Sequence, residues 1–308
     1  MLCLLTLRCS RLALLAALLP MAAAAAQAPA RMRTEQLAPG LHLVTGGDAG
    51  NVLVLESGDG VLLVDTRDTS EVAPFDSIVR TLSTKRVRTV INTHYHFDHV
   101  GANAHYAARG AKLIAQKQLP ALARRDTIIP EMRNWRLVPI ASRGIPKQTF
   151  GDSMSFRFGQ QAVVLYHPPK AHTGGDAIIW LRDADVMHVG DIVEIGAPPF
   201  IDWWGGGSLD GMIAACERIL AIGGPSTRIV PGHGPVVTRD EVREYRDMLV
   251  TIRSRVTAAL DSGRTRDQLL ETSPTKEFDA RLGGEGRAKG FARLVWYGLA
   301  RDRVRQSR

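Results

Sequence analysis

The feature that most constrains this chain is a short polar loop at residues 94–99, rich in side chains that bind metal ions. A run with strand character, residues 87–91, precedes the loop, and a predicted helix, residues 100–108, follows it. Side chains two residues apart in an extended chain project to the same side, so the first two histidines form a pair before the chain bends. The loop can therefore supply two ligands to each of two neighbouring metal ions. Its ligand-type residues are His94, His96, Asp98 and His99.

The residue types in this loop indicate which metal it would hold. Imidazole nitrogen and carboxylate oxygen together suit zinc best, and iron and manganese also accept them. The alternative is a polar loop with chance histidines. Because the chain has only 9 histidines in 308 residues, a chance cluster of this density is the weaker interpretation.

Composition narrows the class of protein. A length of 308 residues fits one large domain or two small ones, and 45% hydrophobic with 23% charged residues is typical of a globular protein with a sizeable core. The net charge of +8 is compatible with nucleic acid binding, but the basic residues are scattered through the sequence. The sequence has no basic patch interleaved with aromatic residues, which is the pattern typical of nucleic acid binding. We therefore expect a small-molecule substrate and no nucleic acid. The sequence specifies no oligomeric state.

The first 26 residues have the pattern of a secretory signal peptide. Arg8 and Arg11 form a positive start, residues 12–19 are apolar, and three alanines at 24–26 offer a cleavage site. The apolar run is too short to span a bilayer alone, so we expect no stable membrane insertion after cleavage. An uncleaved anchor is the alternative. The pattern predicts a bacterial protein that is periplasmic or secreted.

Cysteine usage predicts no internal disulfide. Cys3 and Cys9 lie in the predicted signal peptide, which leaves Cys216 alone in the mature chain. Cys216 lies among apolar residues at helical spacing, which is typical of a small buried hydrophobic residue.

The remaining chain alternates strands and helices in both halves, which predicts a layered α/β fold with mixed sheets. Thr238 and Glu241 form a capping box that opens a long helix. We expect a catalytic domain at residues 36–262 and a helical C-terminal extension at residues 263–308. We expect residues 119–146 to be irregular. The other expected helices are 75–82, 210–220 and 291–299. The other expected strands are 41–44, 52–55, 61–64, 112–115, 155–158, 161–166, 177–181, 186–189 and 228–230.

Three more ligand-type residues follow predicted strands at turns rich in glycine and proline. His172 lies in an Ala-His-Thr-Gly-Gly-Asp segment, Asp191 follows Gly190, and His233 lies in a Pro-Gly-His-Gly-Pro segment. Such turns present a side chain at the edge of a sheet. Each is a weak signal alone, but the three together, in this order, are a strong one.

With these residues the chain resembles the metallo-β-lactamase superfamily over roughly residues 36–240. The resemblance rests on the histidine loop, on His172, Asp191 and His233, and on the strand-end segment Leu63-Val64-Asp65-Thr66. It implies an αββα sandwich of two mixed sheets flanked by helices, with two zinc ions at one edge.

The resemblance also implies a role for each ligand. Asp191 would bridge the two metal ions, and Asp98 would also orient the nucleophile and carry a proton to the leaving atom. Asp65 would orient the histidine loop from behind, or would only cap the end of its strand. The ligands of the first zinc would be His94, His96 and His172, and those of the second Asp98, His99 and His233.

The implied activity is a dinuclear zinc-dependent hydrolysis, in which a hydroxide between the metals attacks an ester, lactone, thioester, amide or lactam carbonyl. True metallo-β-lactamases usually have Cys or Ser where this chain has Asp191, so the chain looks more like the glyoxalase II, lactonase and general hydrolase branches. A β-lactamase proper, a mononuclear-iron sulfur dioxygenase of the same fold, and a non-catalytic binding protein remain as alternatives. The intact ligand set disfavours the last of these.

Two segments are candidates for walls of the substrate site. Residues 198–212 combine aromatic and aliphatic side chains with three consecutive glycines, and predict either an apolar wall over the metals or a surface loop packed by its own tryptophans. Residues 119–146 are a candidate for a second wall. The remaining histidines are expected to be structural: His42, His105, His167 and His188.

Overall fold

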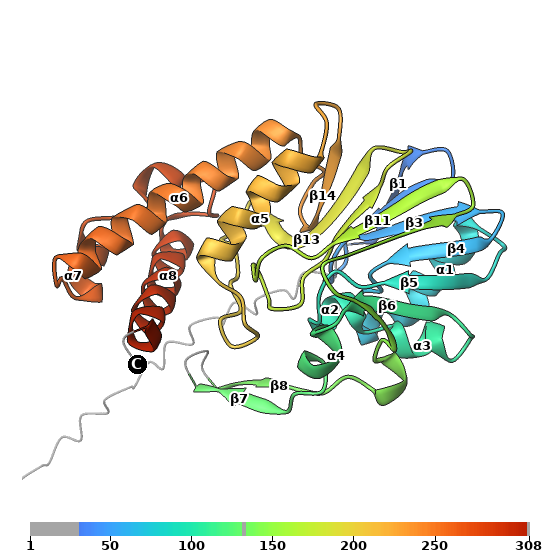
Figure 1. Ribbon diagram of the computed structural model, residues 1–308, viewed down its shortest axis with the longest axis horizontal. Helices are drawn as coiled ribbons and strands as arrows, with labels where there is room; N and C mark the ends of the chain where they lie inside the picture. The colour runs from blue at the N-terminus through green and yellow to red at the C-terminus, as the bar shows by residue number, and fades with distance from the viewer. Residues whose placement is uncertain (1–30, 131–133, 307–308) are drawn as a thin grey trace, which may run out of the picture.

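The computed structural model describes residues 31–130 and 134–306, and the predicted signal peptide lies outside this range (Figure 1). Two large sheets form its centre. The first has the strand order β1-β2-β3-β4-β5-β6-β9, and the second has the order β10-β11-β12-β13-β14. The bounds are β1 (Arg33–Ala38), β2 (Leu41–Thr45), β3 (Val52–Ser57), β4 (Gly60–Val64), β5 (Val87–Ile91), β6 (Lys112–Gln116), β9 (Gln148–Phe150), β10 (Ser153–Phe158), β11 (Gln161–Tyr166), β12 (Ile178–Leu181), β13 (Val186–Glu194) and β14 (Arg228–His233).

Both sheets are mixed, as predicted. In the first, β1 to β4 pair antiparallel and β4, β5, β6 and β9 pair parallel. In the second, β10 to β13 are antiparallel and β14 runs parallel to β13. Parallel strands end at the same edge of a sheet, so the loops that follow β5, and those that follow β13 and β14, can meet at one end of the sandwich.

Helices cover the outer face of each sheet, which completes the predicted αββα sandwich (Figure 1). Strand β3 shows how the layers arise from the sequence. Its side chains alternate, so that Leu53 and Leu55 join the core between the sheets while Val52 and Val54 join the core under the helices. The helices over the first sheet include α1 (Val72–Leu82) and α3 (Asn103–Ala107), and those over the second include α5 (Leu209–Ile222) and α6 (Arg239–Asp261).

The C-terminal helices pack on α6 and share its hydrophobic core. Helix α7 spans Arg266–Glu271 and helix α8 spans Glu285–Gln306, which is much longer than the predicted 291–299. The predicted capping box at Thr238 is present, and Thr265 forms a second one with Gln268 at the start of α7. Because α8 contains glycines that disfavour helix, its packing on α6 decides its length. No helix in the described part of the chain is both long and apolar enough to cross a bilayer.

Two local predictions were wrong. The helix predicted at 100–108 is two short helices, α2 (Phe97–Val100) and α3, because the chain at Gly101 packs closely on the backbone near Asp68. The segment 119–146 contains α4 (Leu119–Leu122) and a hairpin of β7 (Thr127–Ile129) and β8 (Trp135–Leu137). Its strands are too short to give a clear periodic signal.

Candidate metal centre

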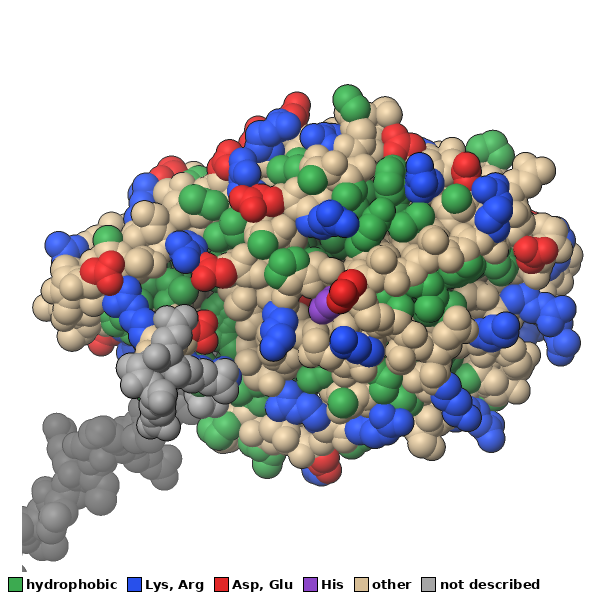
Figure 2. All heavy atoms as spheres, in the orientation of Figure 1, with side chains coloured by type: hydrophobic (Ala, Val, Ile, Leu, Met, Phe, Trp, Pro, Cys, Tyr) green, Lys and Arg blue, Asp and Glu red, His purple; other side chains and the backbone are tan. Residues whose placement is uncertain are grey.

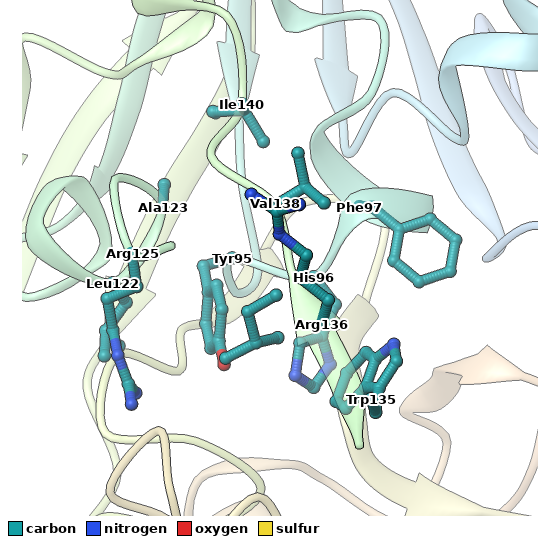
Figure 3. Close-up of a pocket in the computed structure, with 11 residues that line it drawn as sticks. Tyr95, His96, Phe97, Leu122, Ala123, Arg125, Trp135, Arg136, Val138 and Ile140 are labelled. Atoms are coloured by element: carbon teal, nitrogen blue, oxygen red, sulfur yellow. The ribbon is translucent and has the colours of Figure 1, made fainter. Parts of the chain in front are cut away.

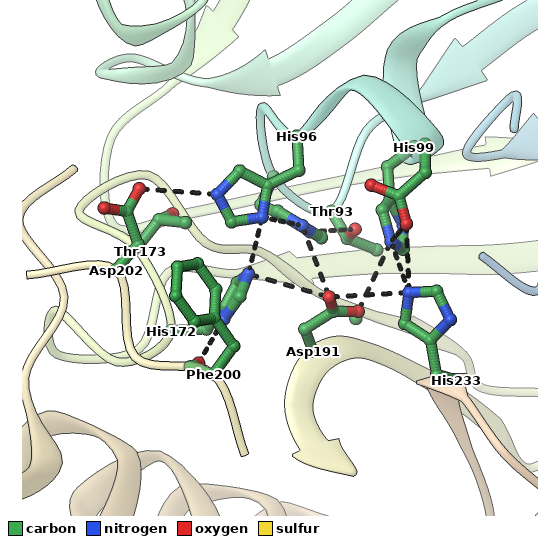
Figure 4. A network of polar contacts seen from close by, with 12 residues as sticks. Thr93, His96, His99, His172, Thr173, Asp191, Phe200, Asp202 and His233 are labelled. Atoms are coloured by element: carbon green, nitrogen blue, oxygen red, sulfur yellow. Dashed lines mark hydrogen bonds and ion pairs between the residues drawn. The ribbon is translucent and has the colours of Figure 1, made fainter. Parts of the chain in front are cut away.

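The seven predicted ligands come together from five different segments (Figure 4). The loop after β5 and helix α2 carry four of them, the β11–β12 loop carries His172, strand β13 carries Asp191, and the end of β14 carries His233. Their ligand atoms form two groups, each with all of its atoms within 4.8 Å of one another. The first group is His94, His96, His172 and Asp191, and the second is Asp98, His99 and His233.

Asp191 lies inside β13, whereas the sequence predicted a strand that ends at 189. Gly190, with a φ of +55°, bends the strand beside Thr93, and the pairing of β13 with β14 shifts register there. The bend places the Asp191 carboxylate between the two groups. Its Oδ2 lies 3.6 Å from His172 Nε2 in the first group, and its Oδ1 lies 3.4 Å from His99 Nε2 in the second.

The outer nitrogens of the buried histidines have partners that orient the rings. The Phe200 carbonyl accepts from His172 Nδ1 at 2.7 Å, and Asp65 Oδ2 lies 2.8 Å from His99 Nδ1. Because carbonyl and carboxylate oxygens only accept, Nδ1 carries a proton in both rings, which leaves Nε2 as the nitrogen that can bind a metal at the centre. His94 Nδ1 lies 3.0 Å from Thr93 Oγ1, which leaves its Nε2 facing inward as well.

Asp65 orients the histidine loop, which is the first of the two roles considered for it. Besides contacting His99, it accepts hydrogen bonds from the Thr93 backbone N–H at 2.8 Å and from the Thr93 hydroxyl at 2.7 Å. It is fully buried and has a positive φ of 66°. One carboxylate thus fixes both the start of the histidine loop and the orientation of the ring near its end.

A metal ion fits the atoms of the centre better than hydrogen bonds alone do. His96 Nδ1 lies 2.9 Å from His172 Nε2 and 3.1 Å from His94 Nε2. These three nitrogens therefore converge, although His172 Nε2 and His94 Nε2 carry no proton with which to form a hydrogen bond. Asp191 Oδ1 is buried without a hydrogen-bond partner among the described residues. Converging lone pairs and an unpartnered carboxylate oxygen are what a bound cation would satisfy.

Burial and neighbouring charges set the protonation of the ligands. Burial, followed by the charge of His96, lowers the pKa of His172 to about 4, and burial also lowers the pKa of His94. Burial raises the pKa of Asp98, but the charges and hydrogen bonds of His99 and His233 outweigh it and hold that pKa well below its usual value. Burial also lowers the pKa of His99 and His233, but the carboxylates of Asp98 and Asp191 outweigh it and raise both pKa values. Because metal binds a neutral imidazole and an ionised carboxylate, His99 and His233 would release a proton on binding a metal.

Asp202 is a residue of the site that was not predicted from the sequence. It is fully buried, accepts a hydrogen bond from the Gly205 N–H at 2.7 Å, and contacts the Tyr95 hydroxyl. Its Oδ2 also lies 3.3 Å from His96 Nε2, the nitrogen that faces away from the centre. The sequence does contain a signal for Asp202, because it is the only carboxylate in the apolar run 198–204. A charged side chain in such a run needs a partner when it is buried.

Residues 198–212 have the first of the two roles considered for them, that of an apolar wall beside the centre. The Phe200 ring lies against His96 and His172, with ring centroids 5.8 and 5.9 Å apart. Trp203 is buried, and Trp204 stacks on Tyr297 of α8 at 5.6 Å. The start of the segment therefore walls the centre, while its tryptophans pack against the rest of the protein.

The segment 119–146 forms a second wall, around a cavity of about 160 Å³ beside His96 (Figure 3). Residues 122–125, at the end of α4 and just after it, and residues 135–140, in β8 and just after it, supply most of its lining, which is largely apolar. Trp135, at the start of β8, has its ring centroid 6.4 Å from that of His96.

On its other side the centre reaches the surface through His233, whose side chain is 36% exposed. Figure 2 shows a histidine and an acidic side chain together on one face, with lysine or arginine side chains around them.

The four histidines expected to be structural lie outside both groups. His188, for example, is buried with Nε2 3.1 Å from the Asn51 carbonyl.

Comparison with known proteins identifies the family of the chain. A sequence-family model of the metallo-beta-lactamase superfamily matches residues 45–233. The metallo-beta-lactamase type 2 of Bacillus cereus is 25% identical over 203 residues, which cover 65% of this chain and 72% of that protein. An acyl-coenzyme A thioesterase of Gallus gallus is 24% identical over 155 residues, which cover 46% of this chain and 55% of that protein. The solved structure of a metallo-beta-lactamase from Pontibacter korlensis matches with a TM-score of 0.59 and 18% identity, over 71% of this chain and 99% of that one.

Proposed function

The chain belongs to the metallo-beta-lactamase superfamily, and from this membership we propose that it is a dinuclear zinc hydrolase that cleaves an ester, lactone, thioester or lactam carbonyl. The observation that carries the proposal is the position of Asp191, whose carboxylate lies 3.6 Å from His172 Nε2 in the first group of ligand-type residues and 3.4 Å from His99 Nε2 in the second. A carboxylate placed in this way suits a pair of adjacent metal ions better than a single one.

The ligands are assigned by the two groups. His94, His96 and His172 would hold one ion, Asp98, His99 and His233 the other, and Asp191 both. Zinc suits this set of nitrogen and oxygen donors, and iron or manganese is the alternative metal. When bound, such a pair supplies a hydroxide at neutral pH and polarises a carbonyl oxygen.

The protein's own residues orient the reactants and move the proton. Asp98 Oδ2 lies 3.0 Å from His233 Nε2 and 3.3 Å from His99 Nε2, at the side of the centre that opens to solvent. The charges and hydrogen bonds of His99 and His233 outweigh burial and keep Asp98 ionised, so it can orient the nucleophile. In the proposed reaction it also carries a proton to the leaving atom. Phe200 excludes water from the opposite side, next to His96 and His172.

Asp191 favours esters, lactones and thioesters over lactams, because true metallo-β-lactamases usually carry Cys or Ser at the corresponding position. Similarity to an acyl-coenzyme A thioesterase supports this preference. Similarity to the Bacillus cereus metallo-beta-lactamase keeps lactam hydrolysis as the second candidate. An iron-dependent sulfur dioxygenase would instead consume oxygen and contain iron.

The predicted signal peptide further leads us to propose a periplasmic or secreted enzyme, which cell fractionation tests.

The deciding experiment loads the protein with two equivalents of zinc and compares a chromogenic cephalosporin with ester, lactone and thioester substrates. A His96→Ala variant is the control for the centre. We expect turnover of at least one of the last three classes, abolished in the control, and little of the cephalosporin. Rapid cephalosporin turnover would make lactam hydrolysis the function, and oxygen uptake with bound iron would favour the dioxygenase.

A further inference from the structure

The cavity beside His96 lies where part of a substrate would enter the centre (Figure 3). Its walls come from α4, from the β7–β8 hairpin and from the histidine loop. We propose that this cavity binds the acyl group of the substrate, and that this group is apolar, about the size of one six-membered ring, and neutral or anionic. The inference rests on the proposed hydrolysis and adds the substrate class.

The size of the cavity limits the acyl group. Its volume is about 160 Å³, and apolar protein cavities of about 150 Å³ hold a benzene molecule. Leu122, Ala123 and Leu137 line it, together with the aromatic rings of Tyr95 and Trp135. A benzyl or cyclohexyl group would fill this space, whereas an acetyl group would leave most of it empty.

The positions of His96 and Asp98 determine which end of the substrate enters the cavity. His96 belongs to the first group of ligands and forms a wall of the cavity. Asp98, proposed to protonate the leaving atom, belongs to the second group and contacts His233 at the solvent side. With the leaving group beside Asp98, the acyl side of the carbonyl lies toward His96 and the cavity.

Two arginines at the cavity determine the charge it accepts. Arg136 forms hydrogen bonds of 3.0 Å with both oxygens of Asp126, which neutralises it. Arg125 donates to the Trp204 carbonyl at 2.6 Å, and no carboxylate in the described residues forms an ion pair with it. Its charge therefore disfavours a cationic acyl group and can bind a carboxylate on an anionic one.

The test compares two esters with the same leaving group, p-nitrophenyl acetate and p-nitrophenyl phenylacetate, on the zinc-loaded full-length protein. We expect kcat/KM to be at least tenfold higher for the phenylacetyl ester. Ala123→Leu should lower this preference at least tenfold by filling the cavity. Leu122→Ala should shift the preference toward a 1-naphthylacetyl ester. The matched control is Ile128→Ala, an exposed position on the same hairpin that does not line the cavity, and it should keep the wild-type ratio.

A binding measurement separates this inference from the proposed hydrolysis. Calorimetry should show that phenylacetate binds the zinc-loaded protein at least tenfold more tightly than acetate, that Ala123→Leu removes the difference, and that 4-(aminomethyl)phenylacetate binds more weakly than phenylacetate. Binding of this kind without hydrolysis of either ester would support the cavity and count against ester hydrolysis as the activity. Hydrolysis of both esters at equal rates, with equal binding of both acids, would overturn the cavity assignment and leave the hydrolase standing.

Discussion

Asp202 Oδ2 lies 3.3 Å from His96 Nε2, on the side of the imidazole that faces away from the other ligands (Figure 4). The contact joins residues that are 106 positions apart in the chain. Burial raises the pKa of Asp202, but the hydrogen bond and charge of His96 outweigh burial and bring it to about 2. At neutral pH Asp202 is therefore an acceptor, which keeps the proton of His96 on Nε2 and the lone pair of Nδ1 toward the centre.

Asp202→Asn should weaken metal binding at the first group, because an amide no longer fixes the proton of His96. Loss of such an outer partner typically reduces metal affinity about 10- to 100-fold. Competition with a zinc chelator should show one weakened and one unchanged binding step. Asp210→Asn, an exposed acid paired with Arg253, is the matched control and should keep both affinities. Unchanged affinities in Asp202→Asn would mean that the contact does not orient the ring.

Asp191→Ala should weaken both metal sites together and abolish hydrolysis, because its carboxylate faces both groups of ligands. Elemental analysis after dialysis should find fewer than two zinc ions per chain, with a rate at least 100-fold below wild type. Asp191→Asn, which keeps the shape of the side chain, separates loss of charge from a packing defect. Wild-type metal content and rate in both variants would remove Asp191 from the site.

Removal of residues 263–308 should unfold the protein rather than release an independent domain. Leu269, Phe291 and Val295 share one hydrophobic cluster with Leu249 and Ile252 of α6. Each large side chain uncovered costs about 2 kcal/mol, and a domain has a total stability of only about 5–15 kcal/mol. Circular dichroism and thermal unfolding of a chain that ends at Ser262 would check this. A cooperative transition near the wild-type Tm would show that the segment is a dispensable extension.

Cys216 should not react with thiol reagents in the folded protein. It is fully buried, and burial raises the pKa of its thiol to about 12, so the thiolate is scarce at pH 8. In a chain that begins at Gln27, where Cys216 is the only cysteine, Ellman's reagent should label no thiol before denaturation and one after it. Rapid labelling of the native protein would show that α5 opens readily.

Much of the fold follows from local sequence. The alternation in residues 52–55 gives a strand with a different core on each face, and the capping boxes at Thr238 and Thr265 mark helix starts that the structure has. The hairpin within 119–146 and the full length of α8 were not predicted, because short strands and a glycine-containing helix depend on packing more than on local preference.

The sequence by itself was enough to predict a metal centre and its seven ligand-type residues. Metal binding depends on residue type, and these residues follow strands in a recognisable order. Only the tertiary structure decided how they divide into two groups, that Asp191 faces both, and that Asp202 stands behind His96. The pairing of strands in two sheets sets these distances across more than a hundred residues, and no local pattern encodes them. The cavity beside His96 has the same origin, since its walls meet only after the sandwich has formed.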